Sequence, residues 1–207
     1  PAETPYPEWD AGQKINGQTA SSRLILTTGS SGTGADFQYN NMSGTQKGLL
    51  DVDMYATNDL CGPERVAYLR GDRTYEGVGT FTCTTNTGAG TIQNFRTRAV
   101  SVLGDVINSN PVYVGPPSAG YSDVDHPGYS TFQSDFSTRK PVLYVGANDG
   151  MLHGIDVTVD TATNTPATSA GTEVIAYVPS MVYANLNKLT EDDYKANGNH
   201  RYFVDSS

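Results

Sequence analysis

Residues 142–157, "VLYVGANDGMLHGIDV", restrict the possible folds more than any other stretch of the chain. Two apolar runs with alternating polarity flank the short segment "ANDG". Asn, Asp and Gly tolerate positive φ angles, so they form tight reversals at low conformational cost. The stretch therefore predicts a β-hairpin whose structural turn contains Asn148, Asp149 and Gly150.

Two further apolar runs, 111–115 ("PVYVG") and 173–179 ("EVIAYVP"), flank this hairpin and predict one strand on either side. Four consecutive antiparallel strands are the unit of one β-propeller blade. A propeller closes only with about four or more blades, and repeat units need neighbours to bury their faces. We therefore expect a mainly β protein that forms a partial β-propeller with short helices, as a fragment of a larger propeller.

The N-terminal half has a different sequence pattern, with signals for both strands and helices. Residues 1–22 are Pro-containing and predict an extended lead-in, and 23–28 ("RLILTT") predict a strand, with a second strand at 36–40 ("DFQYN"). Ser43 and Gln46 have the spacing of a capping box, which predicts a short helix. A second helix is predicted in "GPERVAYLRG", because Pro63 suits the first helical position and Gly71 can end the helix.

This difference in sequence pattern predicts that the chain has two parts. We assign residues 1–94 to a connecting segment before the propeller and 95–207 to the first blade and the start of the next. Within the second part, "SMVYANLNKL" predicts a short helical segment capped by Ser180, and "RYFVD" at 201–205 predicts a further strand. The loops 116–140 and 158–172 are of a length that often carries function.

The charge balance excludes several classes of partner. The formal net charge is −9, from 22 acidic and 13 basic residues spread along the chain. Such a surface repels phosphate, which argues against nucleic acid and anionic membranes as partners. The chain contains no apolar run near the roughly 20 residues that span a bilayer, so we expect no membrane insertion. We expect any signal peptide to lie upstream or to have been removed.

Cys61 and Cys83 are the only cysteines. Two cysteines do not form a zinc site alone, and no histidine stands at ligand spacing from them. The composition, poor in Lys and rich in Thr, Ser and Asn, is typical of secreted proteins, in which disulfides persist. We interpret the pair as a disulfide candidate, and two unrelated buried thiols as the alternative.

Other polar motifs favour structural interpretations. Asp51, Asp53 and Asp59 match part of an EF-hand count, but Gly and Glu are missing where such a loop needs them. Asp123 and Asp125 in "SDVDH" predict a solvated acidic loop. In the tripeptide "RGD" at 70–72, Gly71 suits a helix end and the flanking charges suit a solvated surface.

The alternation of the hairpin's second strand predicts the surroundings of two side chains, His153 and Asp156. Alternation places His153 with the apolar residues of the strand, so we expect it to be partly buried and hydrogen-bonded. Asp156 is expected on the opposite side, bonded to loop amides. The sequence contains no nucleophile elbow, no "HExxH" motif and no paired carboxylates flanking a cleft, so no catalytic residue is assigned and the protein is predicted not to be an enzyme.

Several stretches in order, "RVAYLRGDRT", "FRTRAVSVLGDVINSNPVYVG", "VLYVGANDGMLHGIDV", "EVIAYVPSMVYANLNKLT" and "NHRYFVD", resemble the C-terminal propeller region of the PilY family. "WDAG" and "SRLILTT" resemble the family's segment just before the propeller. Members of this family are type IV pilus tip-associated adhesins. The resemblance covers nearly the whole chain. It depends on the order and spacing of all these stretches and not on any single motif.

The resemblance implies a non-enzymatic type IV pilus biogenesis factor and tip adhesin, or fimbrial protein. It implies roles in surface attachment, twitching motility and calcium-dependent pilus extension and retraction. The implied location is extracellular, at the pilus tip or cell surface after export through the periplasm. The implied partners are minor pilins or the pilus tip, and a host or abiotic surface. The implied cofactor is calcium, whose site we expect outside this chain, beyond Ser207.

Two alternatives belong to other functional classes. The blade motifs are also similar to those of periplasmic quinoprotein oxidoreductases, whose dehydrogenases use adjacent cysteines and a stacked tryptophan. Cys61 and Cys83 are not adjacent, and Trp9, the only tryptophan, lies in the lead-in. The other alternative is a glycan-binding module in which exposed tyrosines such as Tyr121 and Tyr129 are stacking platforms.

Overall fold

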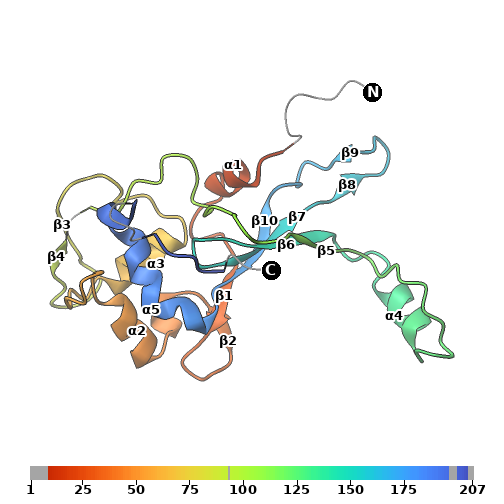
Figure 1. Ribbon diagram of the computed structural model, residues 1–207, viewed down its shortest axis with the longest axis horizontal. Helices are drawn as coiled ribbons and strands as arrows, with labels where there is room; N and C mark the ends of the chain where they lie inside the picture. The colour runs from red at the N-terminus through yellow and green to blue at the C-terminus, as the bar shows by residue number, and fades with distance from the viewer. Residues whose placement is uncertain (1–8, 93, 196–199, 205–207) are drawn as a thin grey trace.

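The computed structural model describes residues 9–92, 94–195 and 200–204. Its centre is a six-stranded sheet in the order β2-β1-β10-β7-β6-β5 (Figure 1). Along the chain the strands are β1 (Ile25–Thr28), β2 (Gly34–Asp36), β5 (Val112–Val114), β6 (Val142–Gly146), β7 (Leu152–Asp156) and β10 (Glu173–Tyr177). The sheet does not close on itself among these residues, which is the form of a partial propeller.

The predicted hairpin is formed by β6 and β7, in register from Val142 opposite Asp156 to Gly146 opposite Leu152. β5 and β10 pair antiparallel with its two sides. The four predicted strands are therefore confirmed in sequential, antiparallel order. This is the arrangement of one propeller blade.

The sheet continues beyond this blade into the N-terminal half. β1 lies parallel to β10, with Ile25 opposite Ala176, and β2 pairs antiparallel with β1. The amide of Ala176 donates to the Leu24 carbonyl over 2.9 Å. One sheet thus contains strands from both sides of residue 95, where we placed the boundary between the two parts.

The N-terminal helices follow their local signals. In α2 (Gly44–Leu50) the Ser43 side chain accepts from the Gln46 amide, and the Gln46 side chain accepts from the Ser43 amide. α3 (Gly62–Leu69) has proline in its first turn, and Gly71 after its end has a φ of +111°. The predicted strand 36–40 is wrong beyond Asp36, because the chain turns there into a 3-10 helix, η1 (Tyr39–Asn41).

The predicted C-terminal helical segment is confirmed, as a series of short turns. These are η2 (Ser180–Val182), α5 (Tyr183–Leu186), η3 (Asn187–Thr190) and η4 (Asp192–Lys195). The predicted cap is wrong: Ser180 is the first residue of η2, and no side chain caps that turn.

The strand predicted at 201–205 is not present over 201–204, and Asp205 lies outside the described residues. The segment instead bonds across the hairpin. The Phe203 amide donates to Asn148 Oδ1 over 3.1 Å, and the Ser109 hydroxyl donates to the Val204 carbonyl over 3.2 Å.

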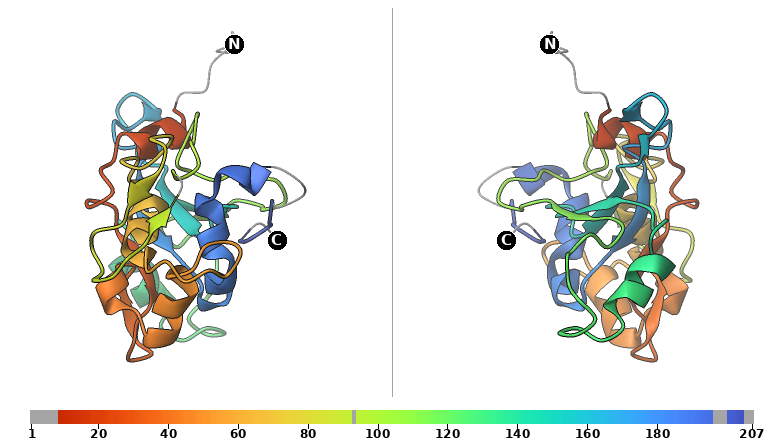
Figure 2. Two further views of the ribbon diagram at one scale, coloured as in Figure 1. Left: turned by 90° about the vertical axis from the view of Figure 1, so that its left-hand side faces the viewer. Right: turned by 90° about the vertical axis from the view of Figure 1, so that its right-hand side faces the viewer.

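The remaining elements are short. They are α1 (Ala11–Asn16), β3 (Phe81–Thr82), β4 (Thr91–Ile92), α4 (Tyr129–Asp135), β8 (Val159–Asp160) and β9 (Thr165–Pro166). The helices α2, α3 and α5 gather at one end of the molecule, while α4 lies beyond β5 at the other end (Figure 1). Figure 2 looks along the long axis from both ends: α2 and α3 face the viewer in the left-hand view, and α4 faces the viewer in the right-hand view.

The main hydrophobic core joins the sheet to α2, α3 and α5. Ile25, Leu50, Leu69, Tyr183 and Leu186 are among its buried members. Each fully buried side chain of this size contributes roughly 1.5–3 kcal/mol through apolar burial. This core therefore stabilises the packing of the three helices on the sheet. No helix in the described part of the chain is long and apolar enough to cross a bilayer.

Candidate interaction surface and the buried charges behind it

Four charged side chains form a buried row beside the β6–β7 turn, and we call Arg23, Glu173, His153 and Asp149 the charge cluster. Arg23 Nε donates to Glu173 Oε2 over 2.7 Å, and His153 Nδ1 lies 2.7 Å from Glu173 Oε1. His153 Nε2 lies 3.1 Å from both Asp149 oxygens. His153 is fully buried, and 15% of the Asp149 side chain is exposed. The row joins the segment just before β1 to β10 and the hairpin.

The row alternates in charge at neutral pH. Burial alone lowers the pKa of His153, but the carboxylates of Asp149 and Glu173 outweigh burial and raise this pKa to about 9. Burial raises the pKa of Glu173, whereas bonds from His153 and Arg23 bring it down to about 2. His153 is therefore an imidazolium between two carboxylates. Its predicted hydrogen bonding is confirmed, whereas its burial is complete rather than partial as predicted.

The three turn residues do more than reverse the chain. The Asn148 amide donates to the Asp105 carbonyl over 3.0 Å, and Asp149 Oδ2 accepts from the Gly104 amide over 2.8 Å. Gly150 has a φ of +90°, and a Cβ there would lie 2.6 Å from a methyl carbon of Leu186. The turn is thus fixed from both sides.

A cavity of about 580 Å³ lies beside this turn. Residues 96–105 form one wall, with Asn148, Asp149 and Tyr194 on the others. Its carboxylates are already bonded: Asp149 to His153 and Asp105 to the side-chain amide of Asn148. Both carboxylates of the cavity thus have a protein partner, and Asp105 Oδ2 also lies 3.5 Å from His200 Nε2.

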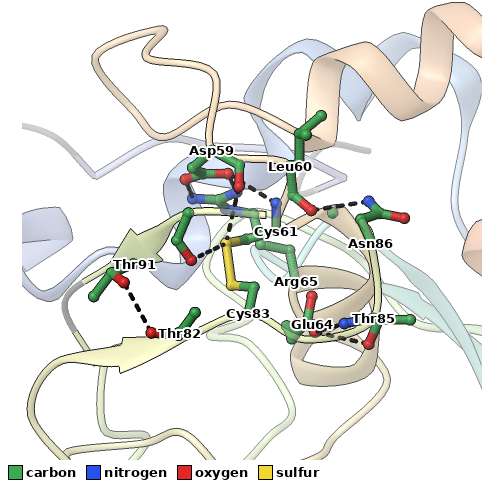
Figure 3. The surroundings of a disulfide bond; sticks show 12 residues. Asp59, Leu60, Cys61, Glu64, Arg65, Thr82, Cys83, Thr85, Asn86 and Thr91 are labelled. Carbon is green, nitrogen blue, oxygen red and sulfur yellow. Dashed lines mark hydrogen bonds and ion pairs between the residues drawn. A yellow bond between two sulfur atoms is a disulfide. The ribbon is translucent and has the colours of Figure 1, made fainter. Parts of the chain in front are cut away.

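The structure brings the two cysteines together. Cys61 and Cys83 form a disulfide with a Cα–Cα distance of 5.5 Å, which ties the start of α3 to the β3–β4 hairpin (Figure 3). Close to it, both Asp59 oxygens accept from the guanidinium of Arg65, and Glu64 Oε1 accepts from the Thr85 amide and hydroxyl. The loop 74–94 is thereby held against the helix.

The acidic motif at 51–59 is occupied by protein partners. Asp51 accepts from the Tyr39 hydroxyl, and Asp53 accepts from the backbone amide of Thr57. Asp59 forms an ion pair with Arg65. No group of three or more acidic, His or Cys side chains in the described part of the chain could hold a metal ion. The structure thus does not assemble these three carboxylates into a cation site.

In the "RGD" tripeptide Arg70 is buried, whereas Gly71 and Asp72 are partly exposed. Arg70 is only 7% exposed, and its guanidinium donates to the carbonyls of Ala20, Arg23 and Phe37. The prediction that Arg70 belongs to a solvated surface is wrong, because its buried guanidinium bonds carbonyls that precede β1 and follow β2. Gly71 follows α3 as predicted.

The long loop 116–140 forms an arm that carries α4. Within the described chain, α4 buries none of its own residues. At the base of the arm, Arg139 donates to the Gly115 carbonyl, through Nε over 2.7 Å. Near its tip, Asp123 accepts from the Ser130 amide over 2.8 Å and from the Ser130 hydroxyl. The arm is therefore shaped by its own bonds, with its predicted acidic residues, Asp123 and Asp125, at the surface.

Aromatic rings follow one another along this segment, which we call the aromatic arm. Centroid distances are 4.5 Å from His126 to Tyr121, 5.2 Å from Tyr121 to Tyr129, 6.0 Å from Tyr129 to Phe132 and 5.0 Å from Phe132 to Phe136. Tyr121 is 58% exposed and Phe136 is 45% exposed. A connected row of large exposed rings is typical of a binding surface.

The other long loop, 158–172, contains the β8–β9 hairpin, so it is a second arm rather than irregular chain. At its start Asp156 accepts from the Thr158 amide and from Lys140 Nζ, each over 2.8 Å. The predicted bond of Asp156 to a loop amide is confirmed. At its end, Gly171 lies against Trp9, which packs on the small core of Ile15.

The residues 103–207 match the family model described as the PilY1 beta-propeller domain. The type IV pilus biogenesis factor PilY1 of Pseudomonas aeruginosa (strain PAK) is 39% identical over 194 residues, covering 89% of this chain and 14% of the relative. PilY1 of P. aeruginosa strain UCBPP-PA14 is 33% identical over 213 residues, covering 97% and 16%. A PilY1 homolog of Xylella fastidiosa (strain Temecula1) is 34% identical over 146 residues, covering 69% and 10%.

The chain thus spans about one seventh of the length of the first of these relatives. No solved structure matches it. The family model covers just over half of the chain, including all four strands of the blade and both arms. The chain belongs to the PilY1 family and contains part of its β-propeller domain.

Proposed function

We propose that this chain acts, without catalysis, in type IV pilus biogenesis and in attachment at the pilus tip, as a rigid blade that presents two arms to partners. The observation that carries the proposal is the contrast in burial: a buried, ion-paired sheet supports an aromatic arm whose helix buries nothing. Binding residues are commonly placed on loops held by a rigid scaffold. The relatives named as type IV pilus biogenesis factors support the cellular role.

The location proposed is extracellular, at the pilus tip or cell surface, after export through the periplasm. The Cys61–Cys83 disulfide supports an oxidising compartment. The proposed partners are minor pilins at the tip and a host or abiotic surface. Calcium, with its effect on pilus extension, retraction and twitching, belongs to the proposal as a site outside this chain.

The test is to shorten each arm in the native protein. Residues 118–137 and, separately, 161–164 are replaced by short Gly-Ser linkers in the cells that make the protein, and pilus number and attachment are measured. We expect loss of attachment when the aromatic arm is removed. Wild-type attachment and pilus number in both variants would contradict the proposal.

A further inference from the structure

Near the tip of the aromatic arm lies an open cavity of about 420 Å³, within the roughly 300–1,000 Å³ of small-molecule sites. Its lining combines ring faces with polar groups. The lining residues are Asp125, His126, Pro127, Gly128, Tyr129 and Phe132.

The polar groups of this cavity are available for a ligand. Asp125 Oδ2 accepts from the Ser122 hydroxyl over 3.0 Å, while Asp125 Oδ1 and both ring nitrogens of His126 have no hydrogen-bond partner among the described residues. The cavity thus offers a carboxylate oxygen and an imidazole beside two aromatic rings. A sugar ring needs this combination, because its C–H face packs on an aromatic ring while its hydroxyl groups donate to and accept from polar side chains.

We infer that this cavity is a binding site for a neutral glycan. The inference rests on the proposed function, for which it names the chemical class of the attachment target. Anionic glycans fit less well, because Asp125 lies in the cavity, Asp123 lies beside it and the chain carries a net charge of −9.

The composition of the arm favours a sugar over a protein partner. Among Val, Leu, Ile and Met, residues 116–140 contain only Val124, which does not line the cavity. Protein interfaces combine aromatic anchors with an apolar, close-packed centre. Here the rings alternate with Ser, Thr, Asp, Gln and His instead.

The cavity is also shaped in advance. The bonds from Ser130 to Asp123 hold one side of it, and Gly128, with a φ of +89°, leads into α4 on the other. Contacts among Tyr121, Tyr129 and Phe132 fix the ring positions. A preformed site loses less conformational entropy when its ligand binds.

The experiment screens the 207-residue chain against an array of neutral and sialylated oligosaccharides, and then titrates the best neutral glycan by calorimetry. We expect retention on neutral glycans, weaker retention on their sialylated forms, and a roughly tenfold or greater loss of affinity in Tyr129→Ala. Asp125→Asn keeps the shape of the side chain, and we expect it to lose affinity roughly fivefold or more. Val124→Ala, a matched change on the same arm, should bind as the wild type does.

Three results would overturn the inference: no retention of any neutral glycan, wild-type affinity in both Tyr129→Ala and Asp125→Asn, or a concentration-dependent dimer that Tyr129→Ala abolishes. Circular dichroism shows whether each variant is folded. Loss of attachment on arm removal, with no glycan bound, would refute only this inference. Wild-type attachment and pilus number in both arm variants would instead refute the proposed function.

Discussion

The charge cluster and the aromatic arm are stabilised by opposite means. The charge cluster pairs Arg23 of the N-terminal half with Glu173 of the blade across 150 residues of sequence, and Glu173 with His153 across 20 residues. The aromatic arm is held by bonds between near neighbours, such as Asp123 to Ser130. Because of this difference, we expect substitutions in the charge cluster to destabilise the fold and substitutions in the aromatic arm to leave it intact.

The largest expected effect comes from removing the central carboxylate of the charge cluster. In Glu173→Gln, Arg23 and His153 lose the carboxylate between them while buried, so we expect a loss of about 3–5 kcal/mol in the free energy of unfolding. Urea denaturation followed by circular dichroism measures it. Asp135→Asn on the exposed helix α4 is the control, with a change below about 0.5 kcal/mol. Equal effects in the two variants would remove the contrast between the regions.

The second effect concerns the cross-link at the helical end. We expect the free energy of unfolding to fall by about 2–4 kcal/mol in the double variant Cys61→Ser, Cys83→Ser. The reason is that the disulfide closes a loop between these two residues and so restricts the unfolded chain. The wild type measured in reducing agent should show the same loss. Two free thiols found by mass spectrometry in the native protein would contradict this prediction.

The third effect is a dependence of stability on pH. The pKa of His153 is raised from 6.5 to about 9 in the folded protein. The stabilisation of the fold by protonated His153 is therefore complete below about pH 6.5 and is lost as pH rises toward 9. The pKa of Glu173 is lowered from 4.5 to about 2, so that stabilisation is complete above about pH 4.5 and is lost as pH falls toward 2. We expect a plateau of Tm between these limits and a fall of several degrees on the alkaline side.

The matched variant for the pH experiment is His153→Gln, which should have a lower Tm and a flatter profile between pH 6.5 and 9. An alkaline fall of the same size in His153→Gln and the wild type would assign the effect to another group. Thermal scans in buffers of equal ionic strength make the comparison, since salt screens the exposed pairs elsewhere.

The smallest effect on stability is expected in the aromatic arm. Phe136 is 45% exposed and its ring contacts Phe132 of the same arm, so Phe136→Ala should change the free energy of unfolding by less than about 0.5 kcal/mol. The same urea titration measures it. A loss above about 1 kcal/mol would mean that the arm contributes to the cooperative core.

Sequence reasoning succeeded where the signal was local. The capping box of Ser43 and Gln46, proline in the first turn of α3 and the "ANDG" reversal each depend on neighbouring residues, and all are present. It failed at Ser180 and at 201–204, where the neighbouring chain decides the backbone. The burial of Arg70 was also missed, because the carbonyls that accept from it lie up to 50 residues away.

The sequence by itself determined the four-strand blade, its central turn, the positions of the long loops and the family resemblance, since each is recorded in local patterns or in their order. Only the tertiary structure decided that β1 extends the blade in parallel with β10, and that His153 lies between two carboxylates. It also decided that the rings of one loop form a connected row. The physical reason is that strand pairing and buried charge depend on which distant residues meet, and alternating polarity does not specify that.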